Sequence, residues 1–127
     1  MRGDRRRTAA VGYLVVQAAL AAGWWGMLML SPESRGDYWP SGWPEEGLLA
    51  FWLPDLLLFI GGSAASAWLV ARQSRRQRAA LWLTAGAAAY AGLFCVSLWA
   101  MTGQAGASAA AMAPAAVATC LIARALA

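Results

Sequence analysis

The sequence contains no histidine and no lysine, and all ten of its basic residues are arginine. The lack of histidine removes the commonest general base, the commonest metal ligand and the usual axial ligand of a haem. The sequence also lacks a phosphate-binding glycine loop, a metal-ligand spacing and a Ser-His-Asp or Cys-His set. We therefore expect no catalytic residue, no metal and no cofactor, and an enzyme is the less favoured interpretation.

Cysteine is also scarce. Cys95 and Cys120 lie in different apolar segments, and they form no Cys-x-x-Cys pattern. We interpret both as small apolar residues that are buried on folding. A disulfide or a redox pair is the alternative.

Charged residues are scarce as well: they make up 13% of the chain, whereas apolar residues make up 61%. Soluble domains have about a quarter of their residues charged, so this composition is typical of an integral membrane protein. The excess of arginine could indicate a nucleic-acid partner. These arginines flank apolar segments, however, where anionic lipid headgroups neutralise them. We therefore expect the lipid bilayer as a partner and no nucleic acid.

Four apolar segments follow one another, and each is long enough as a helix to cross a hydrocarbon core of about 30 Å. We predict one all-α integral membrane domain whose four transmembrane helices form two antiparallel hairpins. The predicted spans are residues 8–30, 48–71, 79–101 and 105–126, and the one substantial loop is 31–47. A cleaved signal peptide, the alternative for the first segment, is disfavoured by the length of that segment and by the apolar segments that follow it.

The arginines predict the orientation of these helices, because basic residues in short loops favour the cytoplasmic side. Four arginines precede the first span, four lie between the second and third, and one ends the fourth, whereas the other two connections contain only Arg35. Both termini are therefore predicted to be cytoplasmic, and loop 31–47 to face the other side. Anionic lipid is the expected partner of the connector arginines, which are Arg72, Arg75, Arg76 and Arg78.

Asp55 is the only carboxylate inside an apolar segment, and it directly follows Pro54. Carboxylates within membrane spans are functional candidates, because burying their charge is costly. The alternative is structural: proline breaks helices and aspartate is a favoured N-cap residue, so the main helix of this segment could begin at Leu56. Pro44, which is followed by two glutamates, predicts an earlier helix start.

Six of the eight tryptophans fall on the non-cytoplasmic side in this topology. Aromatic belts at the membrane interface explain tryptophans on both sides, but they do not explain such an excess on one side. Together with Asp55, these rings suggest a pocket for an amphipathic or cationic ligand, and the belt alone is the alternative. The candidate ligand-binding residues are Asp55, Trp25, Trp39, Trp43 and Trp52.

Small residues recur four apart on one face of the first span, at Ala18, Ala22 and Gly26. Such a ridge allows a second helix to approach closely, and chance in an alanine-rich chain is the alternative. We interpret Gly61 and Gly62 in the second span as a further helix-packing notch.

Polar residues within the spans are the remaining feature. We expect Gln17, Thr84, Tyr90 and Ser97 to be satisfied by hydrogen bonds between helices or to the local backbone. Tyr90 has the greatest need of a partner, because its hydroxyl falls near the middle of the membrane.

The stretch from Phe51 to Ser63, together with the Trp24-Trp25 pair, resembles the N-terminal membrane region of some bacterial isoprenylcysteine-methyltransferase-like proteins. The resemblance covers about a tenth of the chain, and the histidine-bearing methyltransferase half of those proteins has no counterpart here. It therefore implies a fragment of a membrane lipid-modifying enzyme without the catalytic half.

These observations leave three functions open. The favoured one is a non-catalytic accessory or scaffold subunit that packs in a larger membrane complex or with itself. The second is a small transporter or ligand-binding protein that uses Asp55 and the outer tryptophans. The third is the enzyme fragment. Richness in Ala, Arg and Trp without Lys indicates a high-GC bacterium, so we expect a multi-pass protein of the inner membrane.

Overall fold

The computed structural model describes residues 2–127, with Arg2 described by its backbone alone. The described residues form helices and connections without any strand, which confirms the all-helical prediction. The elements are α1 (Arg2–Leu30), η1 (Pro32–Asp37), α2 (Glu45–Leu49), α3 (Trp52–Pro54), η2 (Asp55–Ile60), α4 (Gly61–Ala71), α5 (Gln77–Thr102) and α6 (Gly106–Leu126). Four helical stretches are long and apolar enough to cross a membrane, namely Gly3–Leu30, Glu45–Ala71, Gln77–Thr102 and Gly106–Leu126. The protein is thus of the multi-pass membrane class.

The second of these stretches begins at Glu45, directly after Pro44, as the sequence predicts. The chain bends where α2 ends, because the Phe51 N–H bonds to the Leu48 carbonyl, which is three residues back instead of four. Pro54 explains the bend, since it has no N–H for the carbonyl four residues earlier and its ring crowds that carbonyl.

The N-cap alternative for Asp55 is wrong. Its backbone is helical, with φ −66° and ψ −42°, and the Asp55 N–H bonds to the Phe51 carbonyl as in a continuous helix. An N-cap residue has a non-helical backbone and bonds through its side chain to a following N–H, and Asp55 does neither. Its carboxylate is therefore free to face another part of the protein.

A wide π turn, η2, starts at Asp55. The Gly61 N–H bonds to the Leu56 carbonyl five residues back. A Cβ at Gly61 would lie 3.0 Å from that carbonyl oxygen, so glycine suits this position. The π turn sets the register between Asp55 and helix α4, and such turns often occur at functional sites.

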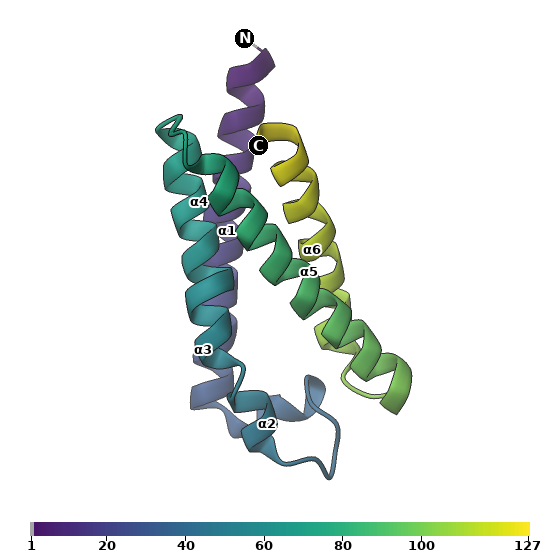
Figure 1. The fold of residues 1–127 in the computed structure, drawn as a ribbon. Coiled ribbons are helices and arrows are strands. Elements are labelled where there is room, and N and C mark those ends of the chain that lie inside the picture. Colours follow the sequence, from purple (N-terminus) through teal and green to yellow (C-terminus); the bar gives the residue numbers. More distant parts are fainter. Residues whose placement is uncertain (1) are drawn as a thin grey trace.

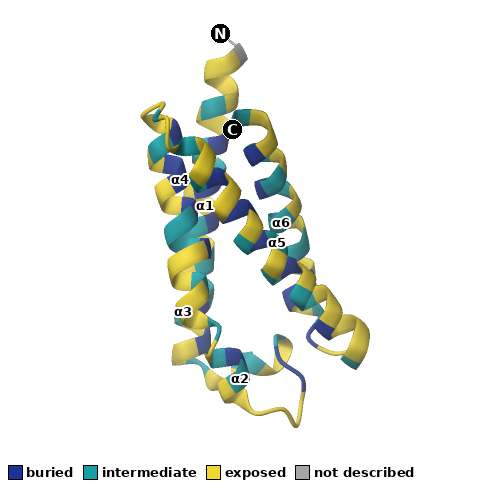
Figure 2. Cartoon of the chain, viewed as in Figure 1, coloured by how far each residue is buried: buried dark blue, intermediate teal, exposed yellow. Residues whose placement is uncertain are grey.

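Two pairs of helices make up the molecule (Figure 1). α1 lies beside α4, and α5 packs closely along α6. The pairs meet at the end that carries both termini and diverge toward the loop that follows α1. The outward faces of the helices are exposed, as Figure 2 shows, whereas buried residues gather where helices meet. This exposed surface is largely apolar, as lipid contact requires.

Where the two helix pairs meet, buried side-chain hydrogen bonds join the helices, and an apolar cluster packs at the same end of the molecule. Gln17 of α1 donates to the Ser63 hydroxyl of α4 (2.9 Å) and accepts from the Thr119 hydroxyl of α6 (3.0 Å). The hydroxyls of Ser66 in α4 and Thr84 in α5 lie 3.1 Å apart. These bonds confirm that Gln17 and Thr84 join helices. The apolar cluster consists of Leu14, Ala67, Val70, Leu81, Ala85 and Ala123.

The predicted small-residue positions differ in their surroundings. A Cβ at Gly62 would lie 2.7 Å from the Thr84 hydroxyl, so Gly62 permits the close approach of α5. Ala18 borders a shallow groove between α1 and α4. Ala22 is exposed, and a Cβ at Gly26 would meet nothing within 4 Å. Within the described chain, no helix therefore covers the Ala22–Gly26 part of the ridge.

At the opposite end, the loop after α1 ties the two pairs together. Both the N–H and the hydroxyl of Ser41 donate to Gln104 in the turn between α5 and α6, at 2.8 and 3.1 Å. The Ser108 hydroxyl of α6 donates to the Tyr38 carbonyl at 3.0 Å. An apolar cluster fills the space beneath the loop, and its buried members are Trp25, Leu28, Trp39, Leu48, Leu98 and Ala105.

Candidate functional site

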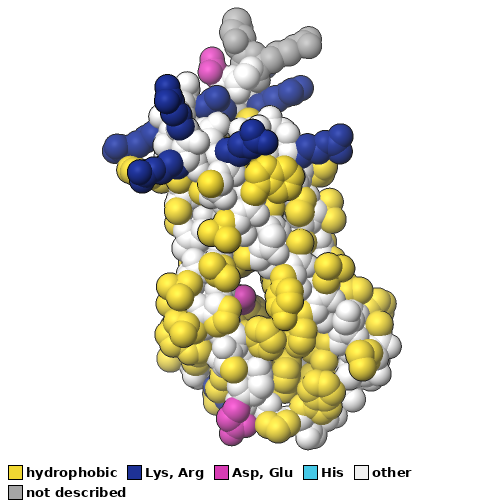
Figure 3. Space-filling view, viewed as in Figure 1, with side chains coloured by type: hydrophobic (Ala, Val, Ile, Leu, Met, Phe, Trp, Pro, Cys, Tyr) yellow, Lys and Arg dark blue, Asp and Glu magenta, His cyan; other side chains and the backbone are white. Residues whose placement is uncertain are grey.

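A cavity of about 670 Å³ lies between the diverging helix pairs. Its walls come from α1, η2, α5 and α6, and its loop end is formed by Tyr38, Trp39 and α2. Figure 3 shows a hollow between the helix pairs with an acidic side chain visible inside it. The aromatic residues that line the cavity are Tyr13, Trp24, Trp25, Tyr38, Trp39, Phe51, Phe59, Tyr90 and Phe94.

Asp55 is the acidic residue of this cavity. The Trp25 indole Nε1–H donates to Asp55 Oδ2 at 3.0 Å, which links the second helical stretch to α1. Trp25 is only 7% exposed and packs in the apolar cluster beneath the loop. Because packing fixes the indole, its N–H is held in place as a donor to the carboxylate.

The second carboxylate oxygen of Asp55, Oδ1, has no hydrogen-bond donor among the described residues. Burying a charged side chain at the centre of a membrane helix costs about 2.5–3.5 kcal/mol, and one hydrogen bond to a charged group contributes about 1.5–3 kcal/mol. The Trp25 bond therefore offsets much of this cost without neutralising the charge. Oδ1 remains available to a donor or a cation from outside the protein.

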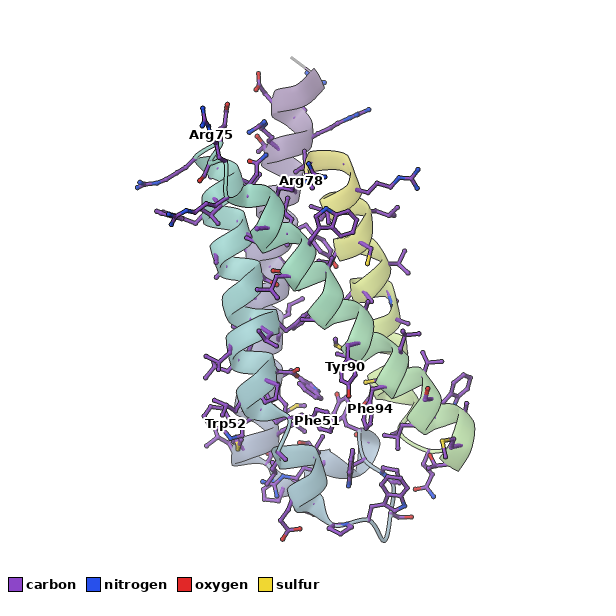
Figure 4. The ribbon with its side chains drawn as sticks, viewed as in Figure 1. Phe51, Trp52, Arg75, Arg78, Tyr90 and Phe94 are labelled. Carbon is purple, nitrogen blue, oxygen red and sulfur yellow. The ribbon has the colours of Figure 1, made fainter. Side chains whose placement is uncertain are left out.

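Ring contacts organise the loop end of the cavity. Trp24 meets Trp25 edge to face at 5.0 Å and Tyr38 at 5.3 Å. Phe51 and Phe94 come from different helix pairs (Figure 4), and the centroids of their rings lie 4.8 Å apart. Such pairs contribute about 0.5–1.5 kcal/mol beyond the area they bury. They join the two sides of the cavity near the loop.

The cavity is closed at its two ends and open at its sides. The polar bonds around Gln17 close one end, and the apolar cluster beneath the loop closes the other. Tyr90 lines the cavity but is 70% exposed, and Leu58 of η2 is exposed as well, so one opening lies between η2 and α5. Exposed lining residues on α1 and α6, including Leu20 and Ala111, mark a second opening. Both openings toward Asp55 are therefore at the sides of the helix pairs.

The structure brings together some of the predicted ligand-binding residues and not others. Asp55, Trp25 and Trp39 all line the cavity, and Trp39 also donates its indole N–H to the Pro44 carbonyl at 3.0 Å. Trp43 packs against Trp39 but is 47% exposed and lies outside the cavity. Trp52 is also outside it and points away from the space between the pairs (Figure 4).

Several cavity residues were not predicted as ligand-binding residues. The α5 wall contributes Tyr90, Phe94 and Cys95. Together with Ala87 and Leu98 of the same wall, Tyr90 and Phe94 follow a helical spacing of three and four residues that could have revealed a common face. The prediction that Tyr90 forms a hydrogen bond within the protein is wrong, because its hydroxyl has no partner among the described residues. Cys95 and Cys120 are both free thiols, so the disulfide alternative is wrong.

Comparison with known protein families, curated proteins and solved structures found no match to this chain. The resemblance to the isoprenylcysteine-methyltransferase-like proteins therefore stays a prediction.

The Trp25–Asp55 hydrogen bond predicts a coupling between these two residues. Trp25→Phe should remove about 1.5–3 kcal/mol of hydrogen-bond energy from the unfolding free energy when Asp55 is present. In the Asp55→Asn background, where the acceptor is a neutral amide oxygen, it should remove only about 0.5–1.5 kcal/mol. The free energy of unfolding in non-ionic detergent, measured for both single variants and the double variant, gives this coupling. Trp52→Phe is the matched control and should show no coupling to Asp55→Asn. Equal effects of Trp25→Phe in both backgrounds would contradict a bond to an ionised carboxylate.

Proposed function

We propose that this protein binds an amphipathic ligand in the cavity between its helix pairs, as a small carrier or transporter of the membrane. The observation that carries the proposal is a carboxylate with an open oxygen in an aromatic cavity. The cavity volume lies within the range of about 300–1,000 Å³ that small-molecule sites occupy. Apolar walls with a few placed polar groups are also typical of such sites.

The cavity favours this function over an accessory or scaffold subunit. Helices that serve only to pack against one another close such spaces, because interiors without bound molecules are densely packed. A subunit role is supported only by the uncovered Ala22–Gly26 part of α1. A native mass measurement in mild detergent tests it, and a lone chain of 13.4 kDa would count against it.

We also propose that the four membrane-length helices cross the bacterial inner membrane as two antiparallel hairpins, with both termini in the cytoplasm. The support is the distribution of arginine, since the described arginines other than Arg35 gather at the end with the termini (Figure 3). The side openings of the cavity then face the hydrocarbon region, and the loop that closes it faces the periplasm. Anionic lipid binds the arginines of the connector, from Arg72 to Arg78.

Cysteine accessibility tests this orientation. In a variant without Cys95 and Cys120, a single cysteine is introduced in the loop by Gly36→Cys or in the basic connector by Ser74→Cys. A membrane-impermeant maleimide should label the loop cysteine in whole spheroplasts, and the connector cysteine only after the membrane is opened. The reverse labelling pattern would overturn the proposed orientation.

Quenching of tryptophan fluorescence tests ligand binding. Bromine quenches an indole that it touches, so ω-bromoundecanol should quench the cavity tryptophans in a saturable way. The reporter is a variant in which the tryptophans outside the cavity are phenylalanine; these are Trp43, Trp52, Trp68, Trp82 and Trp99.

A matched pair of substitutions on α6 provides the control. Ala111→Phe places a ring in the cavity and should weaken binding by about tenfold, which corresponds to about 1.4 kcal/mol of lost contact. Ala110→Phe changes the neighbouring exposed residue, which does not line the cavity, and should leave binding unchanged. Quenching that rises without saturation and equally in both variants would mean partition into detergent and would contradict the proposed function.

A further inference from the structure

The charge of Asp55 has no counter-charge in the described part of the chain. Arginine is absent from the residues that line the cavity. Arg35, at the loop end, pairs with Glu45 at 2.6 Å and donates to the Leu28 carbonyl at 2.9 Å, so it is engaged elsewhere. The other described arginines gather at the opposite end of the molecule (Figure 3). A cation that arrives with the ligand would supply the counter-charge that the described chain does not place beside this carboxylate.

We propose that the ligand carries an ammonium group, which binds Asp55 Oδ1, and an apolar chain, which extends from the cavity into the bilayer. The inference rests on the proposed function and specifies its ligand class. An ammonium group supplies both the missing positive charge and N–H donors for Oδ1. An alcohol would donate a hydrogen bond but leave the charge, and an anionic head would place a like charge beside it.

The aromatic walls fit the same ligand class. Cations are attracted to the faces of Trp, Tyr and Phe within about 6 Å of the ring centre, most strongly where water is excluded. Trp25 and Trp24 lie on the same side of the cavity as the carboxylate contact, and Tyr38 packs against Trp24. The walls therefore offer ring surfaces to an ammonium group and apolar contact to the start of its chain.

The openings of the cavity indicate where the apolar chain lies. Both ends of the cavity are closed, by the polar bonds around Gln17 and by the apolar cluster beneath the loop. The side opening between η2 and α5 is bordered by Leu58 and by Tyr90, whose hydroxyl has no partner among the described residues. In Figure 4, Tyr90 lies beside the space between the two pairs. A chain that leaves by this opening enters the hydrocarbon region, so the ligand resides in the membrane.

Three probes with one tail and different heads test the inference: ω-bromoundecylammonium, ω-bromoundecanol and ω-bromoundecanoate. Their affinities are measured by quenching of the cavity tryptophans in non-ionic detergent. We expect the ammonium probe to bind about tenfold to a hundredfold more tightly than the alcohol, which is the range that one charged hydrogen bond gives. Asp55→Asn should abolish this preference while the alcohol still binds.

Glu46→Gln is the matched control, because it removes one negative charge from an exposed residue outside the cavity. It should keep the full preference for ammonium. Equal affinity of the ammonium and alcohol probes, or a preference that survives Asp55→Asn, would overturn the inference and leave the proposed function standing. If none of the probes binds in a saturable way, the proposed function itself fails.

The ammonium group has two possible sources, a free amphiphile or the headgroup of an aminophospholipid. In vesicles of phosphatidylglycerol, quenching by phosphatidylethanolamine with brominated acyl chains is compared with quenching by the free ammonium probe. Asp55-dependent quenching by the lipid supports the inference and identifies a lipid ligand. Asp55-dependent quenching by the free probe alone supports it and identifies a free amphiphile. Quenching that is independent of Asp55 in both arms would overturn it.

Discussion

The cost of one carboxylate between membrane helices is the constraint on which this structure depends. Asp55 lines a cavity and receives one fixed hydrogen bond, from the Trp25 indole to Oδ2 at 3.0 Å. A fully satisfied buried charge would have a second donor or a basic partner, as structural ion pairs do. The described chain supplies neither, so the charge is held ready for a group from outside.

The fold keeps the space around this carboxylate open by fixing the helix pairs at both ends. Hydrogen bonds from Gln17 and between Ser66 and Thr84 hold the pairs together near the termini. At the other end, Ser41 and Ser108 attach the loop to the α5–α6 turn. Between these two attachments the pairs diverge (Figure 1), and the cavity occupies the gap. The openings of the cavity are therefore lateral, and the same arrangement closes its two ends.

The sequence predicts the helices well because their signal is local. Long apolar segments set the four membrane-length helices, and Pro44 sets the start of the second at Glu45. It predicts the site only in part. Pro54 and Asp55 favour an N-cap as much as a helical kink, and only tertiary contact with Trp25 decides between them. Trp25 and Trp52 look alike in the sequence, but the rotation of each helix places one ring inside the cavity and the other outside. The sequence pattern alone cannot show that the two helix pairs diverge. The exposed position of Tyr90 beside the cavity results from this tertiary packing, so the sequence does not predict it.

The indole N–H resonance of Trp25 gives the most direct test of the central claim, because that proton is donated to the carboxylate that we propose binds the ligand. In a proton–nitrogen correlation spectrum of the protein in non-ionic detergent, each tryptophan indole gives its own peak. Titration with ω-bromoundecylammonium is predicted to shift the Trp25 peak in a saturable manner and to leave the exposed Trp52 peak in place. A Trp25 peak that stays unmoved while the peaks of exposed tryptophans shift would contradict the account.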